Sequence, residues 1–473
     1  MGIIEDAVTG FAGWIWGVPL LILVMGGGLV FLVYSRFLPF KYLGHAINIL
    51  RGKYDNKDEE GQITHYEALS TAIAATVGMG NISGVAVAIT MGGPGAIFWM
   101  WVSAFFGMAT KFFTCTLSVM YRGKDSEGEI RGGPMYVITE GLGKKWKPMA
   151  TFFCVVALVG ALPIFQANQL TAALNTILGP AIGYDTEATI SIVGVSVGIS
   201  SLVTGLVLTV LVSLVIFGGI KRISKVASKL VPSMVLLYFV LVVYILLQNI
   251  SGIPGIFLSI IDEAFTGSAL LGGGIGAVII TGAKRAAFSN EAGIGTAPMI
   301  HGDTKTSEPV REGLVAMLGP AIDTLLVCSL TAFVILGTGV YDQYLGAADT
   351  GLLGVTLTLQ AFNVAIPGVG GYLLGLCILV FAVSTLLSYS YYGVKSMSYL
   401  FGVKRGNYYN YVYIATIVVG AVASLGFVVS LIDGGFALMA IPTMVSALIL
   451  APKAMAAAKD YFARHKAGAF DKD

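Results

Sequence analysis

Charged residues are scarce in this chain of 473 residues, in which Lys, Arg, Asp and Glu together make up 11%. Soluble globular domains carry about 25% of these residues. The formal net charge of +2 offers no extended basic surface for nucleic acid. Only four histidines and four cysteines are present, and neither type shows the spacing of a zinc site or a disulfide framework. We therefore expect no soluble domain, no nucleic-acid partner, no cofactor and no enzymatic activity.

Hydrophobic residues are abundant instead, at 56% of the chain with a mean hydropathy of +0.84. Apolar runs long enough to cross a bilayer, about 20 residues each, recur along the sequence. The pattern predicts an all-α polytopic membrane protein with eleven transmembrane helices. We place these helices at residues 11–34, 66–90, 95–121, 149–177, 199–219, 227–250, 266–290, 309–340, 370–400, 409–431 and 434–451.

The distribution of charge predicts the topology. When the spans alternate sides, the loops and flanking helix ends of one side contain every Lys and Arg except Lys111. The opposite side carries acidic residues, among them Glu5, Asp185 and Asp433. By the positive-inside rule, the protein lies in the cell membrane with its amino terminus outside and its carboxyl terminus in the cytoplasm.

One predicted span is interrupted in its middle by glycine. Between Thr64 and Met91, residues 77–81 read Val-Gly-Met-Gly-Asn. Glycine costs a helix about 1 kcal/mol relative to alanine, so we predict that the backbone unwinds here. The freed N–H and C=O groups cannot face lipid, and the break must be buried in protein or line a watery cavity.

A second glycine cluster lies in the predicted span 266–290, where residues 271–276 read Leu-Gly-Gly-Gly-Ile-Gly. Gly274 follows Gly78 by 196 positions. The chain repeats itself after five predicted helices, so the second copy would be inverted in the membrane. Paired interruptions of this kind indicate a secondary-transporter site near the bilayer midplane. The alternative is that these small residues only allow close helix packing.

The two breaks favour a particular ligand. Amino termini of half-helices direct N–H groups and partial positive charge at one place, which suits a carboxylate, while unwound carbonyls suit a small cation. A zwitterion with a sodium ion satisfies both. Because the nearby side chains are small or apolar, we expect a small neutral amino acid. These neighbours are Ala74, Ala75, Thr76, Met79, Ile275 and Ala277.

Polar groups inside spans are further functional candidates. Lys111 and Asp323 are the ionisable residues that lie most clearly inside predicted spans. Asp323 either pairs with Lys111 or balances the charge of a coupling cation. A polar stretch follows Pro163 and either lines a substrate pocket or makes interhelical hydrogen bonds. It comprises Phe165, Gln166, Asn168 and Gln169.

The sequence at residues 92–107, Gly-Gly-Pro-Gly-Ala-Ile-Phe-Trp-Met-Trp-Val-Ser-Ala-Phe-Phe-Gly, resembles the signature of the alanine or glycine:cation symporter family. That family is a branch of the amino acid, polyamine and organocation transporters. Residues 76–84 and 288–298 are further family-like segments, so the resemblance covers nearly the whole chain. Met91 stands where the family usually has proline.

This resemblance implies a fold similar to that of the neurotransmitter:sodium symporters, with two inverted repeats of five helices and an extra amino-terminal helix. Residues 1–64 would hold the extra helix and a cytoplasmic linker, 65–250 the first repeat, 251–451 the second repeat and 452–473 a cytoplasmic tail. The first and sixth core helices would be the broken ones.

The resemblance also implies roles for individual residues. Glycine amides at both breaks would bind the substrate carboxylate, and carbonyls of the first core helix with hydroxyls of the eighth would hold sodium. The alternative for these hydroxyls is a hydrogen bond to the preceding turn. Thr76 and Asn81 would serve the substrate or a second cation. The implied substrate residues are Thr76, Gly78, Met79, Gly80, Asn81, Phe165, Gln166, Gln169, Gly274, Ile275 and Gly276. The implied sodium residues are Ala74, Val77, Ala382, Ser384 and Thr385.

These observations predict a sodium-coupled symporter that imports alanine, with glycine as a second substrate, by alternating access. The alternative is a proton-coupled transporter or an amino acid exchanger of the same fold. A channel would need a ring of polar or charged groups along its pore, and the sequence shows no such repeated ring.

Overall fold

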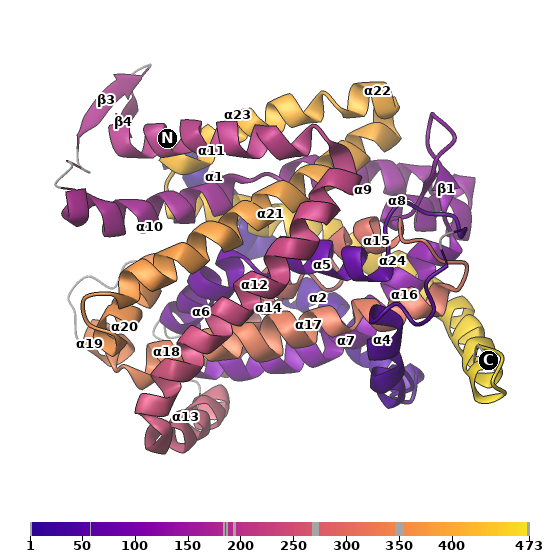
Figure 1. The fold of residues 1–473 in the computed structure, drawn as a ribbon, viewed down its shortest axis with the longest axis horizontal. Helices are drawn as coiled ribbons and strands as arrows, with labels where there is room; N and C mark the ends of the chain where they lie inside the picture. Colours follow the sequence, from indigo (N-terminus) through magenta and orange to yellow (C-terminus); the bar gives the residue numbers. More distant parts are fainter. Residues whose placement is uncertain are drawn as a thin grey trace.

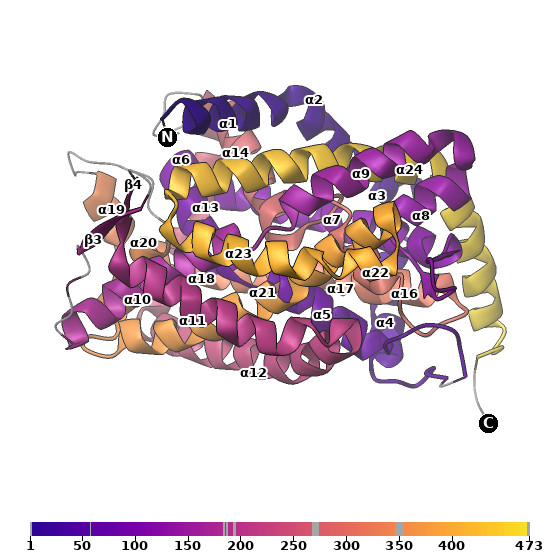
Figure 2. The same ribbon diagram turned by 90° about the horizontal axis from the view of Figure 1, so that it is seen from above.

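The computed structural model describes residues 2–470 except 57, 183–184, 186–187, 193–194, 267–273 and 346–353. Its long helices form a bundle that extends along one axis, with the amino terminus at one end and the carboxyl terminus at the other (Figures 1 and 2).

The first part of the chain contains short helices around one long, central helix, α7. Its elements are α1 (Gly2–Ile15), α2 (Val18–Leu21), η1 (Ile22–Gly26), α3 (Gly27–Tyr34), η2 (Pro39–Tyr42), α4 (Leu43–Leu50), α5 (His65–Thr76), η3 (Gly80–Gly84), α6 (Val85–Gly92), α7 (Gly95–Met120), β1 (Gly123–Lys124), β2 (Ile130–Arg131), α8 (Pro134–Tyr136) and η4 (Val137–Leu142). Strands β1 and β2 pair antiparallel. α6 ends at Gly92, the next residue Gly93 has a positive φ of 70° that is favourable for glycine, and Pro94 then precedes α7.

The middle part contains the long helices that cover one face of the bundle. Its elements are η5 (Lys144–Trp146), α9 (Lys147–Gly160), α10 (Ile164–Ile182), β3 (Thr189–Ile192), β4 (Val195–Gly198), α11 (Ile199–Ile216), α12 (Gly219–Gln248), η6 (Ile250–Gly252) and α13 (Ile253–Thr266). Strands β3 and β4 pair antiparallel. Large apolar side chains of α11 and α12, such as Val210, Leu214 and Leu236, are exposed, as expected of helices that face lipid.

The last part contains the two longest central helices, α21 and α24. Its elements are α14 (Gly274–Asn290), α15 (Thr296–His301), α16 (Pro309–Ala316), α17 (Leu318–Pro320), η7 (Ala321–Cys328), α18 (Ser329–Gly337), α19 (Val340–Leu345), α20 (Val355–Ala365), α21 (Gly370–Phe401), α22 (Val403–Gly406), α23 (Tyr409–Val422) and α24 (Leu425–Lys466). Helix α7 packs against α3, α13, α14 and α16, and α5 packs between α12 and α21.

Within the described ranges, seven helices are long and apolar enough to cross a membrane, and up to nine spans result when each of two bent pairs counts as one. The structure therefore shows a multi-pass helical membrane protein. The predicted span 149–177 is divided in it between α9 and α10, and α20 is a short apolar helix where no span was predicted. The count of eleven, the inverted repeats, the domain limits and the membrane orientation stay predictions.

One predicted boundary is wrong. We placed the last two spans at residues 409–431 and 434–451, with a loop at Asp433. The structure ends α23 at Val422 and starts α24 at Leu425, where Ser424 caps the helix by accepting from the Phe427 N–H at 3.3 Å. Asp433 is thus inside α24, because this cap, rather than the following acidic residue, marks the helix start.

Candidate functional site

The predicted break in the first core helix is confirmed. Helix α5 ends at Thr76, Val77 has an extended backbone, and the π-helical turn η3 starts at Gly80. The segments before and after the break are bent by 51°. Every residue from 68 to 89 is buried, so the freed backbone groups lie inside the protein, as their cost in lipid requires.

Two hydroxyls of α21 meet the last turns of α5. Thr385 Oγ1 lies 2.9 Å from the Ala74 carbonyl oxygen, and Ser384 Oγ lies 3.5 Å from the same atom. Both hydroxyls are also within 3.0 Å of the Phe381 carbonyl in their own helix. The structure thus brings together residues implied for sodium, and it also contains the local hydrogen bond that was the alternative. The two other implied residues, Val77 and Ala382, are buried.

The unwound amides of the first break are satisfied by side chains. Asn81 Oδ1 accepts from the Gly78 N–H at 2.9 Å, and Gln166 Oε1 of α10 accepts from the Met79 N–H at 3.1 Å. Thr76 Oγ1 lies 3.5 Å from the Ile73 carbonyl of its own turn. A substrate carboxylate that used these amides would have to displace the Asn81 and Gln166 oxygens, since each N–H donates one strong hydrogen bond.

Two further residues of α10 have different surroundings. The Phe165 ring packs edge-on against Phe288 of α14, with ring centroids 4.7 Å apart. Gln169 Oε1 accepts from Ser83 Oγ at 2.5 Å and from the Val355 N–H at 3.0 Å. Phe165 therefore belongs to the aromatic wall beside the break, whereas Gln169 joins η3 to α20.

Asp323 of η7 is buried and hydrogen-bonded to both broken regions. Asn81 Nδ2 donates to Asp323 Oδ1 at 2.7 Å. Ser289 Oγ of α14 and Thr324 Oγ1 donate to Asp323 Oδ2 at 2.6 and 2.7 Å. The Asn290 amide donates in turn to Thr324 Oγ1 at 3.0 Å. All of these donors are neutral, so they do not cancel the charge of a buried carboxylate. A buried, uncompensated carboxylate favours a cation nearby.

Lys111 of α7 is the buried cation on this side of the bundle, with 1% of its side chain exposed. It acts electrostatically on Glu291 and Asp323. Among the described residues, however, the salt bridges do not include one between Lys111 and Asp323. Direct pairing, one of the two predicted alternatives for Asp323, is therefore not seen as a contact.

The second break is not where the glycine cluster predicted it. Helix α14 starts at Gly274 and continues without interruption to Asn290. Ile275 is 43% exposed, and a Cβ added at Gly274 or Gly276 would meet nothing within 4 Å. Residues 271–273 of the cluster lie outside the described part of the chain. The predicted position is wrong for the described residues, because Gly274, Ile275 and Gly276 form an exposed helix start rather than a buried interruption.

The interruption instead lies between α14 and α15. Glu291, Gly293 and Gly295 have positive φ angles of 56°, 84° and 106°, a conformation that glycine adopts freely and glutamate does not. Glu291 is buried, and Tyr389 of α21 donates to its carboxylate. Sequence reasoning missed Glu291 as a site residue. The available signal was Asn-Glu-Ala-Gly-Ile-Gly at residues 290–295, in which alternating glycines follow two polar residues.

Ion pairs lie on both sides of this second break along the chain. Before it, Lys284 Nζ lies 2.7 Å from Asp433 Oδ2, and Arg285 pairs with the same carboxylate. After it, Lys395 Nζ lies 2.7 Å from Asp303 Oδ1. The first cluster corrects the predicted charge partition, which placed Asp433 opposite every Lys and Arg except Lys111. These two cations lie beside Asp433 because that residue is inside α24.

Comparison with known proteins gives one consistent result. A family model described as the sodium:alanine symporter family matches residues 1–473. A "sodium/alanine symporter" of Methanococcus maripaludis is 38% identical over 441 residues, which are 92% of each chain. An "uncharacterized transporter" of Haemophilus influenzae is 38% identical over 477 residues, 99% of each chain. A "probable sodium/glutamine symporter" of Bacillus subtilis is 33% identical over 458 residues, 96% of this chain and 90% of that protein.

Proposed function

The chain belongs to the sodium:alanine symporter family, a family of transporters and not of enzymes, and we propose that it imports small neutral amino acids together with sodium. Alanine is the proposed main substrate and glycine a second one. The observation that carries this proposal is the buried break of α5, which has hydroxyls of α21 on one side and a buried carboxylate on the other.

The proposed sodium site lies between α5 and α21. The Ala74 carbonyl, with the hydroxyls of Ser384 and Thr385 beside it, supplies neutral oxygen ligands, and Val77 and Ala382 complete its wall. Hard alkali and alkaline-earth cations bind oxygen rather than thiol or imidazole ligands. Sodium would replace the hydroxyl protons as the partner of the Ala74 oxygen.

The proposed substrate site lies on the other face of the same break. Gly78, Met79 and Gly80 supply backbone groups, with Gln166 as a side-chain amide and the Phe165 ring as an apolar wall. The Phe165 and Phe288 rings, with centroids 4.7 Å apart, offer an apolar surface without a polar partner for a side-chain amide, which supports alanine over glutamine. Asn81 and Asp323 would hold a second cation or balance the first.

Alternating access requires that each end of this centre opens in turn. We propose that the Arg285–Asp433 cluster closes the outside, where the amino terminus lies, and that the Lys395–Asp303 pair closes the cytoplasmic side. Both ion pairs are formed in the described structure, and opening either end would require hydration of the separated charges, because breaking a buried pair without it would be costly.

The decisive experiment is uptake of labelled alanine into proteoliposomes under an inward sodium gradient, compared with potassium at equal pH. We expect accumulation with sodium only, competition by glycine and weak competition by glutamine. Thr385→Ala should lower sodium affinity, whereas Thr176→Ala is the matched control, because Thr176 is exposed and bonds only its own helix. Equal uptake without sodium would reject sodium coupling and favour a proton-coupled transporter or an exchanger.

A further inference from the structure

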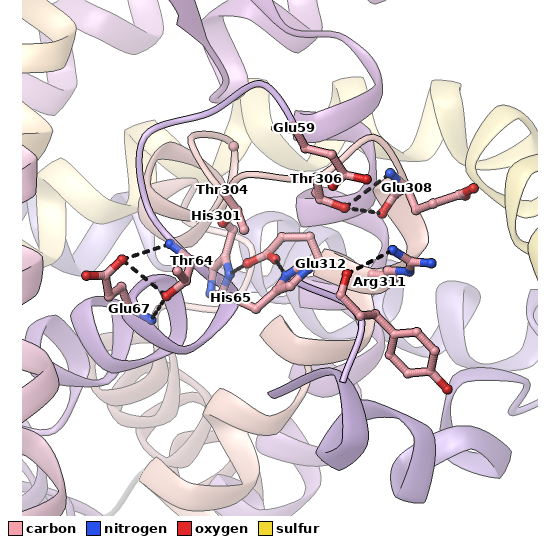
Figure 3. A network of polar contacts seen from close by, with 12 residues as sticks. Glu59, Thr64, His65, Glu67, His301, Thr304, Thr306, Glu308, Arg311 and Glu312 are labelled. Atoms are coloured by element: carbon pink, nitrogen blue, oxygen red, sulfur yellow. Dashed lines mark hydrogen bonds and ion pairs between the residues drawn. The ribbon is translucent and has the colours of Figure 1, made fainter. Parts of the chain in front are cut away.

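Three titratable side chains from three separate elements meet in a fully buried cluster. His65 is the first residue of α5, His301 is the last residue of α15, and Glu312 lies in α16. Each histidine pairs through Nδ1 with a different oxygen of the Glu312 carboxylate (Figure 3). All three side chains are at most 1% exposed. The cluster therefore connects α5, which precedes the first break, with α15, which follows the second break, through one carboxylate.

We propose that His65, Glu312 and His301 form a proton-binding site that holds the cytoplasmic side of the protein closed. The proposal rests on the transport cycle proposed above and adds a proton as a regulatory ligand. With both imidazoles neutral, the cluster carries a buried negative charge. With one imidazolium the cluster is neutral, and both carboxylate oxygens still receive an N–H donor. Burial disfavours net charge, so it favours the state with one bound proton.

The hydrogen bonds indicate which imidazole carries that proton. In the described structure, His301 Nε2 is buried and has no hydrogen-bond partner. A neutral His301 with its proton on Nδ1 leaves only a lone pair unsatisfied there, whereas an imidazolium would bury an unpaired N–H of a cation. The unpaired Nε2 of the buried His301 therefore favours His65 as the proton acceptor.

Most other charged side chains around the cluster are hydrogen-bonded or ion-paired to other residues. Arg311, the neighbour of Glu312, donates to the Tyr54 carbonyl. Glu67 closes the capping box of α5 with Thr64. Cys115 and Arg122 of the packed elements interact electrostatically with Glu312. The remaining titratable groups have partners of their own: Asp303 pairs with Lys395, Glu308 pairs with Arg464, and His45 is hydrogen-bonded to Tyr461. Among the described residues, none of these groups donates a hydrogen bond to the Glu312 carboxylate in place of His65 or His301.

Opening of the cytoplasmic side would separate α5 or α15 from α16. Water would then separate the His65 imidazolium from the Glu312 carboxylate. His65 would therefore bind its proton less tightly than it does in the closed cluster. A ligand that binds the closed state better shifts the population toward it. Acidification of the cytoplasm should therefore slow transport. The ratio of closed to open protein should rise by up to about tenfold per pH unit for one linked proton.

The first test observes the protonation state directly. The chain has four histidines, so histidine labelled with nitrogen-15 gives few imidazole signals in proteoliposomes, and His65→Gln and His301→Gln assign the two of interest. At pH 7 we expect one imidazolium, at His65, and one neutral Nδ1–H imidazole, at His301. Two neutral or two charged imidazoles at that pH would overturn the proposal. This readout does not depend on transport.

The second test measures sodium-driven alanine uptake at fixed external pH while the internal pH of oriented vesicles is lowered from 7.5 to 5.5. We expect the wild-type rate to fall steeply and His65→Gln, in which a neutral amide replaces the titratable imidazole, to give a flat profile. His45→Gln, in the other cytoplasmic histidine cluster, should keep the wild-type profile. An unchanged pH response in His65→Gln would refute the site. Absence of uptake in the wild type at every pH would instead refute the proposed function, and the nitrogen signals would still decide on the proton site.

Discussion

Two glycines of the first break should differ in their response to the same small substitution. A Cβ added at Gly78 would lie 2.3 Å from Thr385 Oγ1 and 3.3 Å from Thr385 Cβ. The same atom at Gly80 would lie 3.5 Å from the Phe288 ring and from Ser289 Cα, which is ordinary van der Waals contact. Gly78→Ala must therefore push the Thr385 hydroxyl away from the Ala74 carbonyl, whereas Gly80→Ala fits without displacement.

The expected size of the effect follows from packing. Overpacking of a well-filled interior costs about 1–3 kcal/mol. If the displaced group is a sodium ligand, most of this cost is taken from sodium binding, and each 1.4 kcal/mol is about tenfold in affinity. We expect Gly78→Ala to weaken sodium activation of alanine uptake about 10- to 100-fold and Gly80→Ala to leave it within about threefold of wild type.

The assay is the sodium dependence of uptake together with thermal unfolding of each purified variant. A double variant, Gly78→Ala with Thr385→Ala, separates the two effects, because removal of the hydroxyl relieves the clash but also removes the proposed ligand. It should recover thermal stability and still lack high sodium affinity. Normal sodium activation in Gly78→Ala, or its loss in Gly80→Ala alone, would refute the placement of the sodium site.

Three further predictions test other parts of the molecule. Asp323→Asn keeps the hydrogen-bonded shape of its cluster but removes the charge, so sodium dependence should be lost while the protein still folds; normal sodium affinity would assign Asp323 a purely structural role. Gly276→Ala should leave uptake unchanged, since the new Cβ meets nothing within 4 Å, and a loss of alanine binding would return this residue to the substrate site. Burial, with His465, Arg311 and Lys53 nearby, lowers the pKa of His45 from 6.5 to about 4. The unfolded chain therefore binds the proton first, and the free energy of unfolding should fall as the pH drops from 6.5 toward 4, with a smaller fall in His45→Gln.

The first break was predictable because its cause is local. Two glycines and an asparagine inside a long apolar run weaken the helix regardless of the rest of the fold, and the structure bends there by 51°. The second break was misplaced for the same reason. The run at residues 271–276 is richer in glycine, but the interruption lies at Glu291–Gly295, where left-handed backbone angles are held by surrounding contacts. Composition measures the ease of unwinding and does not show where the fold requires it.

Contacts between distant residues could not be read from the sequence alone. Asn81 and Asp323 are 242 positions apart, and no spacing rule connects them. Likewise, the meeting of Ala74 with Thr385 was available only through family resemblance. Asp433 was assigned to the short loop between the predicted spans 409–431 and 434–451, whereas in the structure it pairs with Lys284 and Arg285 of another helix.

The short segment from Ala74 to Asn81 belongs to both proposed sites, and this has a consequence for coupling. Ala74 contacts Thr385 at the proposed sodium site, whereas Gly78 and Met79 lie at the proposed substrate site, and Asn81 joins Gly78 to Asp323. A ligand that orders this segment at one site lowers the entropy cost of binding at the other. Coupling between two ligands at equilibrium is reciprocal, so sodium should tighten alanine binding by the same factor by which alanine tightens sodium binding. Calorimetric titrations of each ligand with and without the other give both factors for the purified protein. Equal factors above one are expected, and a factor of one in both directions would mean that the segment does not connect the two sites.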